Sequence, residues 1–177
     1  MAQIKGTSIV TNTEKNISLN EFILIISEII ENAEFQKLEY YSQHLNTSRL
    51  QHSINVAYYT YKMSKSLELD YISATKGALL HDFFLYNWQD KNHNFTEHKY
   101  MHPIAALENS KKYFEVNEIM EDCILNHMWP VTHTRPKTAE GHIVQLADKY
   151  SASIEMSSQS YRFLKGKTLR LFAAITK

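Results

Sequence analysis

The stretch KGALLHDFFLYNW, residues 76–88, is the most informative part of the chain. Small and apolar residues typical of a buried helix lead up to His81 and Asp82, and the aromatic run from Phe83 to Tyr86 follows directly. Removing an ionised carboxylate from water costs several kcal/mol unless a positive group compensates it. We therefore expect a positive partner for Asp82 elsewhere in the protein.

The composition indicates one domain without a charged surface of one sign. The chain has 177 residues, and Lys plus Arg equal Asp plus Glu at 19 each. This balance argues against a membrane surface or a nucleic-acid polymer as a partner, whereas a small anionic substrate needs only a local cluster of cations. Because Cys123 is the one cysteine, no intramolecular disulfide can form, and we expect a cytoplasmic location. The most apolar segment, FILIISEII, is too short and interrupted to span a membrane.

Glycine and proline are rare, which favours long helices over a turn-rich β architecture. With four glycines and three prolines, we predict an all-α fold, a compact bundle of about seven helices without strands. The helices should begin near residues 18, 47, 70, 102, 117, 138 and 160, the last one running over about 160–175. Residues 1–17 read as an irregular arm and 87–101 as a loop. We treat 1–177 as one domain whose core spans about 45–157.

Three local patterns fix the predicted helix starts. Ser18 and Glu21 form a capping box, and Asp70 is a good N-cap for the helix that carries the His-Asp doublet. Proline is favoured at the first position of a helix and disfavours a helical residue before it. His102 followed by Pro103 therefore predicts a helix with His102 as its cap.

Six polar residues fall on the inward faces or ends of successive predicted helices, as facing side chains do in the metal sites of helical bundles. They are His52, His81, Asp82, His102, His127 and Asp148. Imidazole and carboxylate ligands suit Fe, Mn or Zn, and without a cysteine cluster a thiolate site has no support. Six ligands exceed what one catalytic ion takes from protein, so we predict two divalent transition-metal ions bridged by Asp82. His52, His81 and Asp148 would complete the first group, and His102 and His127 the second.

This ordered set resembles the HD-domain phosphohydrolase superfamily. The resemblance covers about residues 45–157, and the phrases LLHDFFLYNW, HMWP and LADKYSASIE look like those of small stand-alone bacterial members. It implies an HD-like fold, metal binding by the six residues named above, and hydrolysis of a phosphate ester or nucleotide anhydride by a hydroxide that bridges the metals. The implied partner is a small phosphorylated substrate or a nucleotide.

The residues after the doublet depart from the family pattern. Many members carry small residues and a lysine there, which helps to hold or protonate the phosphate ester, whereas Phe83, Phe84 and Leu85 follow here. We predict that Arg49 and Lys149 bind the phosphate oxygens instead. The plainer readings are that Arg49 is a surface residue near a helix start and that Lys149 pairs with Glu155 or Glu140.

For catalysis we name Asp82, His133 and Lys149. Asp82 holds the metals, and His133 or Lys149 assists the leaving oxygen. His133 could equally be a loop residue without a role. Among the other histidines, His44, His93, His98 and His142 lie in polar surroundings and should be solvated, but His98 could also reach the site if the loop folds over it. Cys123 is predicted to be part of the core.

The ligand types alone leave three functions open. A metal-dependent phosphohydrolase agrees best with the resemblance. HD relatives with the same ligand set can hold two irons and activate dioxygen, so a di-iron oxygenase is the first alternative. A catalytically silent, metal-stabilised binding module is the second, because the usual lysine after the doublet is missing. The native metal, the substrate and a homodimer also stay open.

Overall fold

A computed structural model describes residues 12–44, 47–87 and 95–157, and it has an all-α architecture, as predicted. Seven α-helices and one short strand pair lie in this part of the chain. They are α1 (Asn12–Ile30), α2 (Ala33–Gln36), a 3-10 turn (Lys37–Tyr40), β1 (Ser42–His44), β2 (Thr47–Ser48), α3 (Arg49–Ser66), α4 (Tyr71–Leu80), α5 (Phe95–Tyr113), α6 (Glu118–Asn126) and α7 (Ala139–Met156). The helix predicted at 160–175 lies outside the described residues, and α2 was not predicted.

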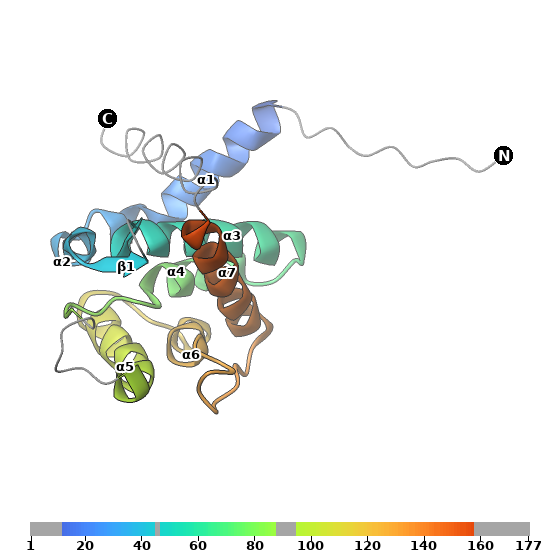
Figure 1. Ribbon diagram of the computed structural model, residues 1–177. Coiled ribbons are helices and arrows are strands. Elements are labelled where there is room, and N and C mark those ends of the chain that lie inside the picture. The colour runs from blue at the N-terminus through green and yellow to red at the C-terminus, as the bar shows by residue number, and fades with distance from the viewer. Residues whose placement is uncertain (1–11, 45–46, 88–94, 158–177) are drawn as a thin grey trace.

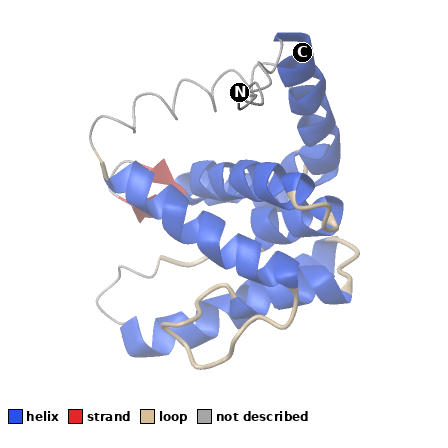
Figure 2. Ribbon diagram, turned by 90° about the vertical axis from the view of Figure 1, so that its right-hand side faces the viewer, coloured by secondary structure: helices blue, strands red, loops and turns tan. Residues whose placement is uncertain are grey.

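Helices α3 and α4 pack side by side at the centre, and α7 crosses both of them (Figure 1). Helix α6 packs on α4 and α7, α5 packs on α6, and α1 also packs on α4. In Figure 2 the short strands, coloured red, lie beside these helices. The core between them contains Phe22, Ile26, Leu50, Leu79 and Ile124, all fully or almost fully buried. The end of α4 therefore lies in the middle of the molecule. No helix among the described residues combines the length and the apolarity needed to cross a bilayer.

Local capping explains where most helices begin. Ser48, Asp70, Asn117 and Thr138 each accept a hydrogen bond from the backbone N–H three residues later, which satisfies a donor that has no partner inside the helix. The caps at Asp70 and Thr138 confirm the predicted starts. Helix α3 begins at Arg49, two residues after the predicted position.

The first helix begins at Asn12, so the irregular arm predicted for 1–17 is wrong for its last residues, and Ser18 is not a cap. Ser18 instead donates a hydrogen bond to the Tyr61 hydroxyl, and the Glu21 carboxylate accepts hydrogen bonds from Tyr61, Tyr71 and Lys65. These contacts link α1 to α3 and α4. The Ser-x-x-Glu pattern that resembled a capping box thus serves tertiary packing.

The observed bounds of helix α5 show that two further predictions are wrong. It begins at Phe95, so residues 95–101 are helical and not a loop, and Pro103 lies inside the helix instead of opening it. Proline inside a helix costs about 3 kcal/mol, because it removes one hydrogen bond and clashes with the preceding turn. The packing of α5 on α6 and the burial of His102 compensate for that cost.

A short antiparallel pair, β1 with β2, corrects the prediction that the fold has no strand. The strands have three and two residues, which is too short for an alternating pattern to be recognised in the sequence. The pair lies directly before α3 and so fixes the position of Arg49, whose backbone N–H donates to the Tyr41 carbonyl at 2.7 Å.

The small residues before the doublet allow α4 and α6 to approach closely. A Cβ atom added at Gly77 would lie 2.8 Å from the Cβ of Cys123 and 3.2 Å from the Cα of Met120. Cys123 itself is fully buried in the core, which confirms its predicted place. Burial raises the pKa of its thiol well above the usual range.

We expect Gly77→Ala to lower stability. The added methyl group overlaps the Cβ atom of Cys123 and lies tightly against the backbone of α6 at Met120. Overpacking of this kind costs about 1–3 kcal/mol, more than the gain of about 1 kcal/mol in helix propensity. Urea unfolding would measure the loss. Combining it with Cys123→Gly removes the nearest atom and should recover part of the loss in a double-mutant cycle. A Gly77→Ala protein as stable as the wild type would contradict the close packing.

The Glu21 carboxylate should make a contribution to stability that depends on pH. Hydrogen bonds from Lys65, Tyr61 and Tyr71 lower the pKa of this carboxyl from 4.5 to about 2. A lowered pKa in the folded state adds stability above the unfolded pKa, and this contribution is lost as the pH falls towards 2. Glu21→Gln should therefore be less stable by up to about 1 kcal/mol at pH 7, with the difference shrinking below pH 4 or so. Thermal unfolding between pH 3 and 7 measures it.

The matched control is Glu28→Gln on the same helix, where the carboxylate pairs with Lys76 and is largely exposed. This substitution should change stability little. A Glu21→Gln effect that does not depend on pH would contradict the assignment to the carboxylate.

Candidate metal centre

The structure brings all six predicted ligands together at the centre of the fold. His52 lies in α3, His102 in α5 and Asp148 in α7, while His81 and His127 are the C-terminal caps of α4 and α6 and Asp82 follows His81. Five of the six are at most 4 % exposed, and the side chain of Asp148 is 16 % exposed. The cluster is therefore shielded from water on most sides, with Asp148 nearest to solvent.

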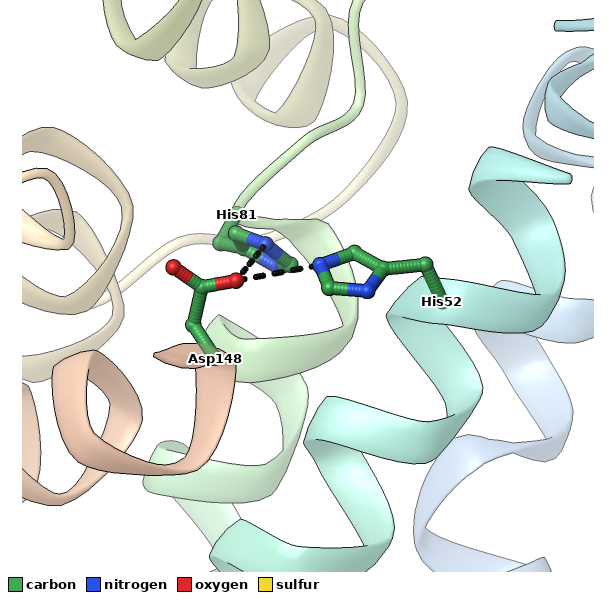
Figure 3. Close-up of side chains that lie close together, drawn as sticks. All are labelled: His52, His81 and Asp148. Carbon is green, nitrogen blue, oxygen red and sulfur yellow. Dashed lines mark hydrogen bonds and ion pairs between the residues drawn. The ribbon is translucent and has the colours of Figure 1, made fainter. Parts of the chain in front are cut away.

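One group of three surrounds the Asp148 carboxylate (Figure 3). Its Oδ1 atom lies 3.1 Å from Nε2 of His52 and 3.8 Å from Nε2 of His81. Figure 3 shows the three side chains pointing towards one another from three helical segments. One ligand atom from each of them falls within 4.8 Å of the other two, which fits a single ion.

The second group surrounds Asp82. Its Oδ2 atom lies 3.4 Å from Nε2 of His81, and its Oδ1 atom lies 3.4 Å from Nε2 of His102 and 3.7 Å from Nε2 of His127. The Nε2 atoms of His102 and His127 are 3.0 Å apart. The Asp82 Oδ2 atom thus faces His81, and its Oδ1 atom faces His102 and His127. One ligand atom each from His81, Asp82 and His127 falls within 4.8 Å of the other two, which fits a second ion.

The backbone holds three of the imidazoles in one orientation. Nδ1 of His81 and of His127 lies 2.7 Å and 2.8 Å from the carbonyl oxygen three residues earlier, and Nδ1 of His102 lies 2.8 Å from the carbonyl four residues earlier. A carbonyl oxygen only accepts, so each Nδ1 carries the hydrogen and each Nε2 of the neutral ring presents a lone pair to the cluster. His81 and His127 thereby satisfy carbonyls that the ends of α4 and α6 would leave without a donor.

A nitrogen lone pair and a carboxylate oxygen that face each other repel unless a cation lies between them. His81 Nε2 and Asp82 Oδ1 are buried and form no hydrogen bond with any described residue. Such groups are costly in a native structure, because they have lost their water without gaining a partner. A divalent ion would bind both atoms, and imidazole with carboxylate is the donor set of Zn, Fe and Mn. The residues present therefore fit a metal centre.

Without a metal, protons must supply the positive charge. Burial lowers the pKa of His52, but the carboxylates of Glu155 and Asp148 outweigh it and raise this pKa well above its usual value. His81 has a raised pKa for the same reason, with Asp82 as the main partner. Burial alone would raise the pKa of Asp82, but the surrounding imidazoles hold it well below the usual range. The cluster thus attracts positive charge at His52 and His81.

The other two histidines behave differently. Burial lowers the pKa of His102, and burial together with the neighbouring His81 and His102 lowers the pKa of His127 to about 3. Both rings are therefore neutral at pH 7, which is the form that binds a metal.

Three supporting residues were not predicted. Glu155 lies 2.9 Å from Nδ1 of His52 and also accepts from Asn55, while Gln43 donates to Asp82 Oδ2 at 2.6 Å. A carboxylate on the outer nitrogen of a ligating histidine fixes the ring and makes it a stronger ligand. Glu155 could have been noticed, because it follows Asp148 by seven residues and so shares its face of α7. Gln43 gives no such signal, because it lies in a short strand far from the doublet in sequence.

The predicted cations occupy different environments. Arg49 is fully buried, and its guanidinium donates to the carbonyls of Phe84 and Tyr86. This burial does not support the predicted contact with phosphate. Lys149 is half-buried, burial lowers its pKa, and its Nζ atom donates to the His127 carbonyl at 3.2 Å. Lys149 is therefore beside the cluster, and the plainer expectation of a surface pair with Glu155 or Glu140 does not hold.

His133 is exposed in the turn after α6, and among the described residues it makes no hydrogen bond with the cluster. Its role as a proton donor stays a prediction. His98 is not simply solvated, because its ring stacks on His102 at 4.6 Å and its Nδ1 lies 3.2 Å from the Tyr86 hydroxyl. His142 contacts Arg135 and Trp129. His93 and the side chain of His44 lie outside what the structure describes.

Buried histidines and aspartates that converge from separate helices are the arrangement by which helical proteins bind metals. Comparison with known families gives the more specific assignment. The HD domain matches residues 49–153, more than half of the chain, and the protein belongs to the HD-domain family. HD domains bind divalent metals and form a superfamily of metal-dependent phosphohydrolases. No curated protein matches the sequence.

We expect metal binding to release protons. In the metal-free protein Glu155 and Asp148 raise the pKa of His52 well above its usual value, so this ring holds a proton that an incoming ion must displace, and the raised pKa of His81 acts in the same direction. Titrating Zn²⁺ into chelator-treated protein by calorimetry, in two buffers of different ionisation enthalpy, should show release of about one proton or more per chain. Affinity should weaken as the pH falls. His133→Ala is the control and should release as many protons; binding without any release would contradict the protonation pattern.

Proposed function

We propose that the protein is a metal-dependent phosphohydrolase that holds two divalent transition-metal ions, Fe, Mn or Zn, and acts on a small phosphorylated substrate or a nucleotide. The observation that carries the proposal is the arrangement of Asp82, whose two oxygens face His81 on one side and His102 and His127 on the other. A carboxylate with imidazoles at both of its oxygens is suited to bridge two ions.

When bound, such ions lower the pKa of water and polarise phosphoryl oxygens, which is the chemistry that hydrolysis of a phosphate ester needs. The protein residues would do the rest. The buried imidazoles and carboxylates hold a fixed geometry and exclude bulk water. Asp148, the most exposed of the six, marks the side on which substrate would enter.

Lys149 is the cation best placed to bind a phosphate oxygen. It follows Asp148 directly, and its ammonium group is held by one carbonyl only, that of His127, among the described residues. A phosphate oxygen would be a stronger acceptor, because hydrogen bonds between ionised groups are roughly twice as strong as neutral ones. His133, in the turn that follows His127, would supply the proton to the leaving oxygen.

The test is hydrolysis by protein loaded with Mn²⁺, Fe²⁺ or Zn²⁺ under nitrogen, on a panel of phosphomonoesters, phosphodiesters and nucleoside mono-, di- and triphosphates. Phosphate or nucleoside release should appear with at least one metal. Asp82→Asn should lose both ions and lower kcat by at least about 1,000-fold, because the metals supply most of the catalysis. Lys149→Gln should raise KM by about 10- to 100-fold.

The matched control is Lys62→Gln on the exposed face of α3, which should leave kcat and KM unchanged. Metal-loaded protein that consumes oxygen in air with organic substrates, and hydrolyses nothing under nitrogen, would favour the di-iron oxygenase. Two bound ions without turnover on the whole panel would favour the silent binding module. The cytoplasmic location and a homodimer stay predictions.

A further inference from the structure

Two segments that lie far apart in the sequence are connected by hydrogen bonds beside the metal centre. The hairpin segment (residues 41–44 and 47–49) runs into α3, and the doublet segment (residues 82–86) runs out of α4. The Tyr41 hydroxyl donates to the Leu85 carbonyl at 3.0 Å, and Gln43 donates to Asp82 at 2.6 Å. The hairpin segment therefore contacts both the start and the end of the doublet segment.

Arg49 is the centre of these contacts. Its Nη1 atom donates to the Phe84 carbonyl at 2.6 Å and to the Tyr86 carbonyl at 3.3 Å, and its Nε atom donates to Oε1 of Gln43 at 3.1 Å. The guanidinium carbon lies 3.5 Å from the centre of the Phe84 ring, a close cation–π contact. Arginine is suited to this position, because its planar fork serves several acceptors and still stacks on an aromatic ring.

The contact of Arg49 with Gln43 continues to the metal centre. Arg49 binds the amide oxygen of Gln43, which orients the amide so that its nitrogen points to Oδ2 of Asp82. Without that contact the amide could turn over and present its oxygen to the carboxylate, which would repel it. Arg49 thus determines which end of the Gln43 amide faces Asp82.

A second route leads through Phe84. The ring under Arg49 is fully buried, and its centre lies 5.4 Å from the centre of the His102 imidazole. The same ring contacts His98, which stacks on His102, so the three rings all contact one another. Phe84 is one of the bulky residues that replace the small residues of other family members after the doublet. It therefore packs between Arg49 and the candidate ligand His102.

We infer that Arg49 and Gln43 are positioning residues of the metal centre, and that Arg49 sets the orientation of the Asp82 carboxylate through the Gln43 amide. This role rests on the metal centre of the proposed function but not on hydrolysis. It gives the buried cation a function at the site without any contact with substrate. Residues that orient a ligand from behind commonly change metal affinity by about 10- to 100-fold.

The experiment is a Mn²⁺ titration of the metal-free protein followed by electron paramagnetic resonance, which reports both free Mn²⁺ and a magnetically coupled Mn²⁺ pair. Gln43→Ala and Arg49→Lys should each weaken binding by about 10- to 100-fold and reduce the coupled signal. Because both residues act through one amide, the double variant should lose no more than the worse single variant, so the effects should not add.

Gln36→Ala is the matched control, because the amide of Gln36, the last residue of α2, donates to the carbonyl of Ile30 at the end of α1. It should lower the melting temperature without changing Mn²⁺ affinity or the coupled signal. If Arg49→Lys did not fold, Gln43→Ala alone would still decide the matter, since Gln43 is only partly buried.

Three other results would count against the role. Unchanged affinity in Gln43→Ala, with normal binding by the wild type, would overturn it and leave the metal centre intact. Independent, additive losses in the double variant would also overturn it. If the wild type bound no Mn²⁺, Fe²⁺ or Zn²⁺, both this role and the proposed function would fall, whereas normal metal binding without hydrolysis would overturn the proposed function only.

Discussion

The structure depends on one constraint. The negative charges of two carboxylates at the centre of the helical core, Asp82 and Asp148, must be compensated by other groups. Each costs several kcal/mol to bury alone, and the fold meets that cost by directing four imidazoles at them from four helices. The packing of α3, α4, α5, α6 and α7 brings those side chains within reach of one another. The charge balance and the helix arrangement therefore depend on each other.

The same histidines also complete the helices that carry them. At the ends of α4 and α6 the last carbonyls lack N–H partners, and Nδ1 of His81 and of His127 supplies the missing donors. One imidazole thus caps a helix with one nitrogen and presents the other to the cluster. This double use fixes the tautomer and keeps the ligand atoms in place before any ion binds, which reduces the ordering that binding would otherwise require.

Around the cluster lies a layer of residues that touch the ligands from behind. Glu155 and Asn55 support His52, and Gln43 with Arg49 supports Asp82. The aromatic residues after the doublet belong to this layer, since Phe83 and Phe84 are fully buried. Both rings pack beside the centre, and the Phe84 ring lies against His102.

The sequence by itself determined the helical class, the caps at Asp70 and Thr138, and the six residues of the cluster, because these follow from local hydrogen bonding and from the cost of burying charge. Only the tertiary structure decided where α5 begins, since packing on α6 outweighs the local preference of Pro103. It also decided that Ser18 and Glu21 bind Tyr61 instead of capping a helix, and that Arg49 is buried. Contacts between segments far apart in the chain carry no local signal, so Gln43 beside Asp82 could be found only in three dimensions.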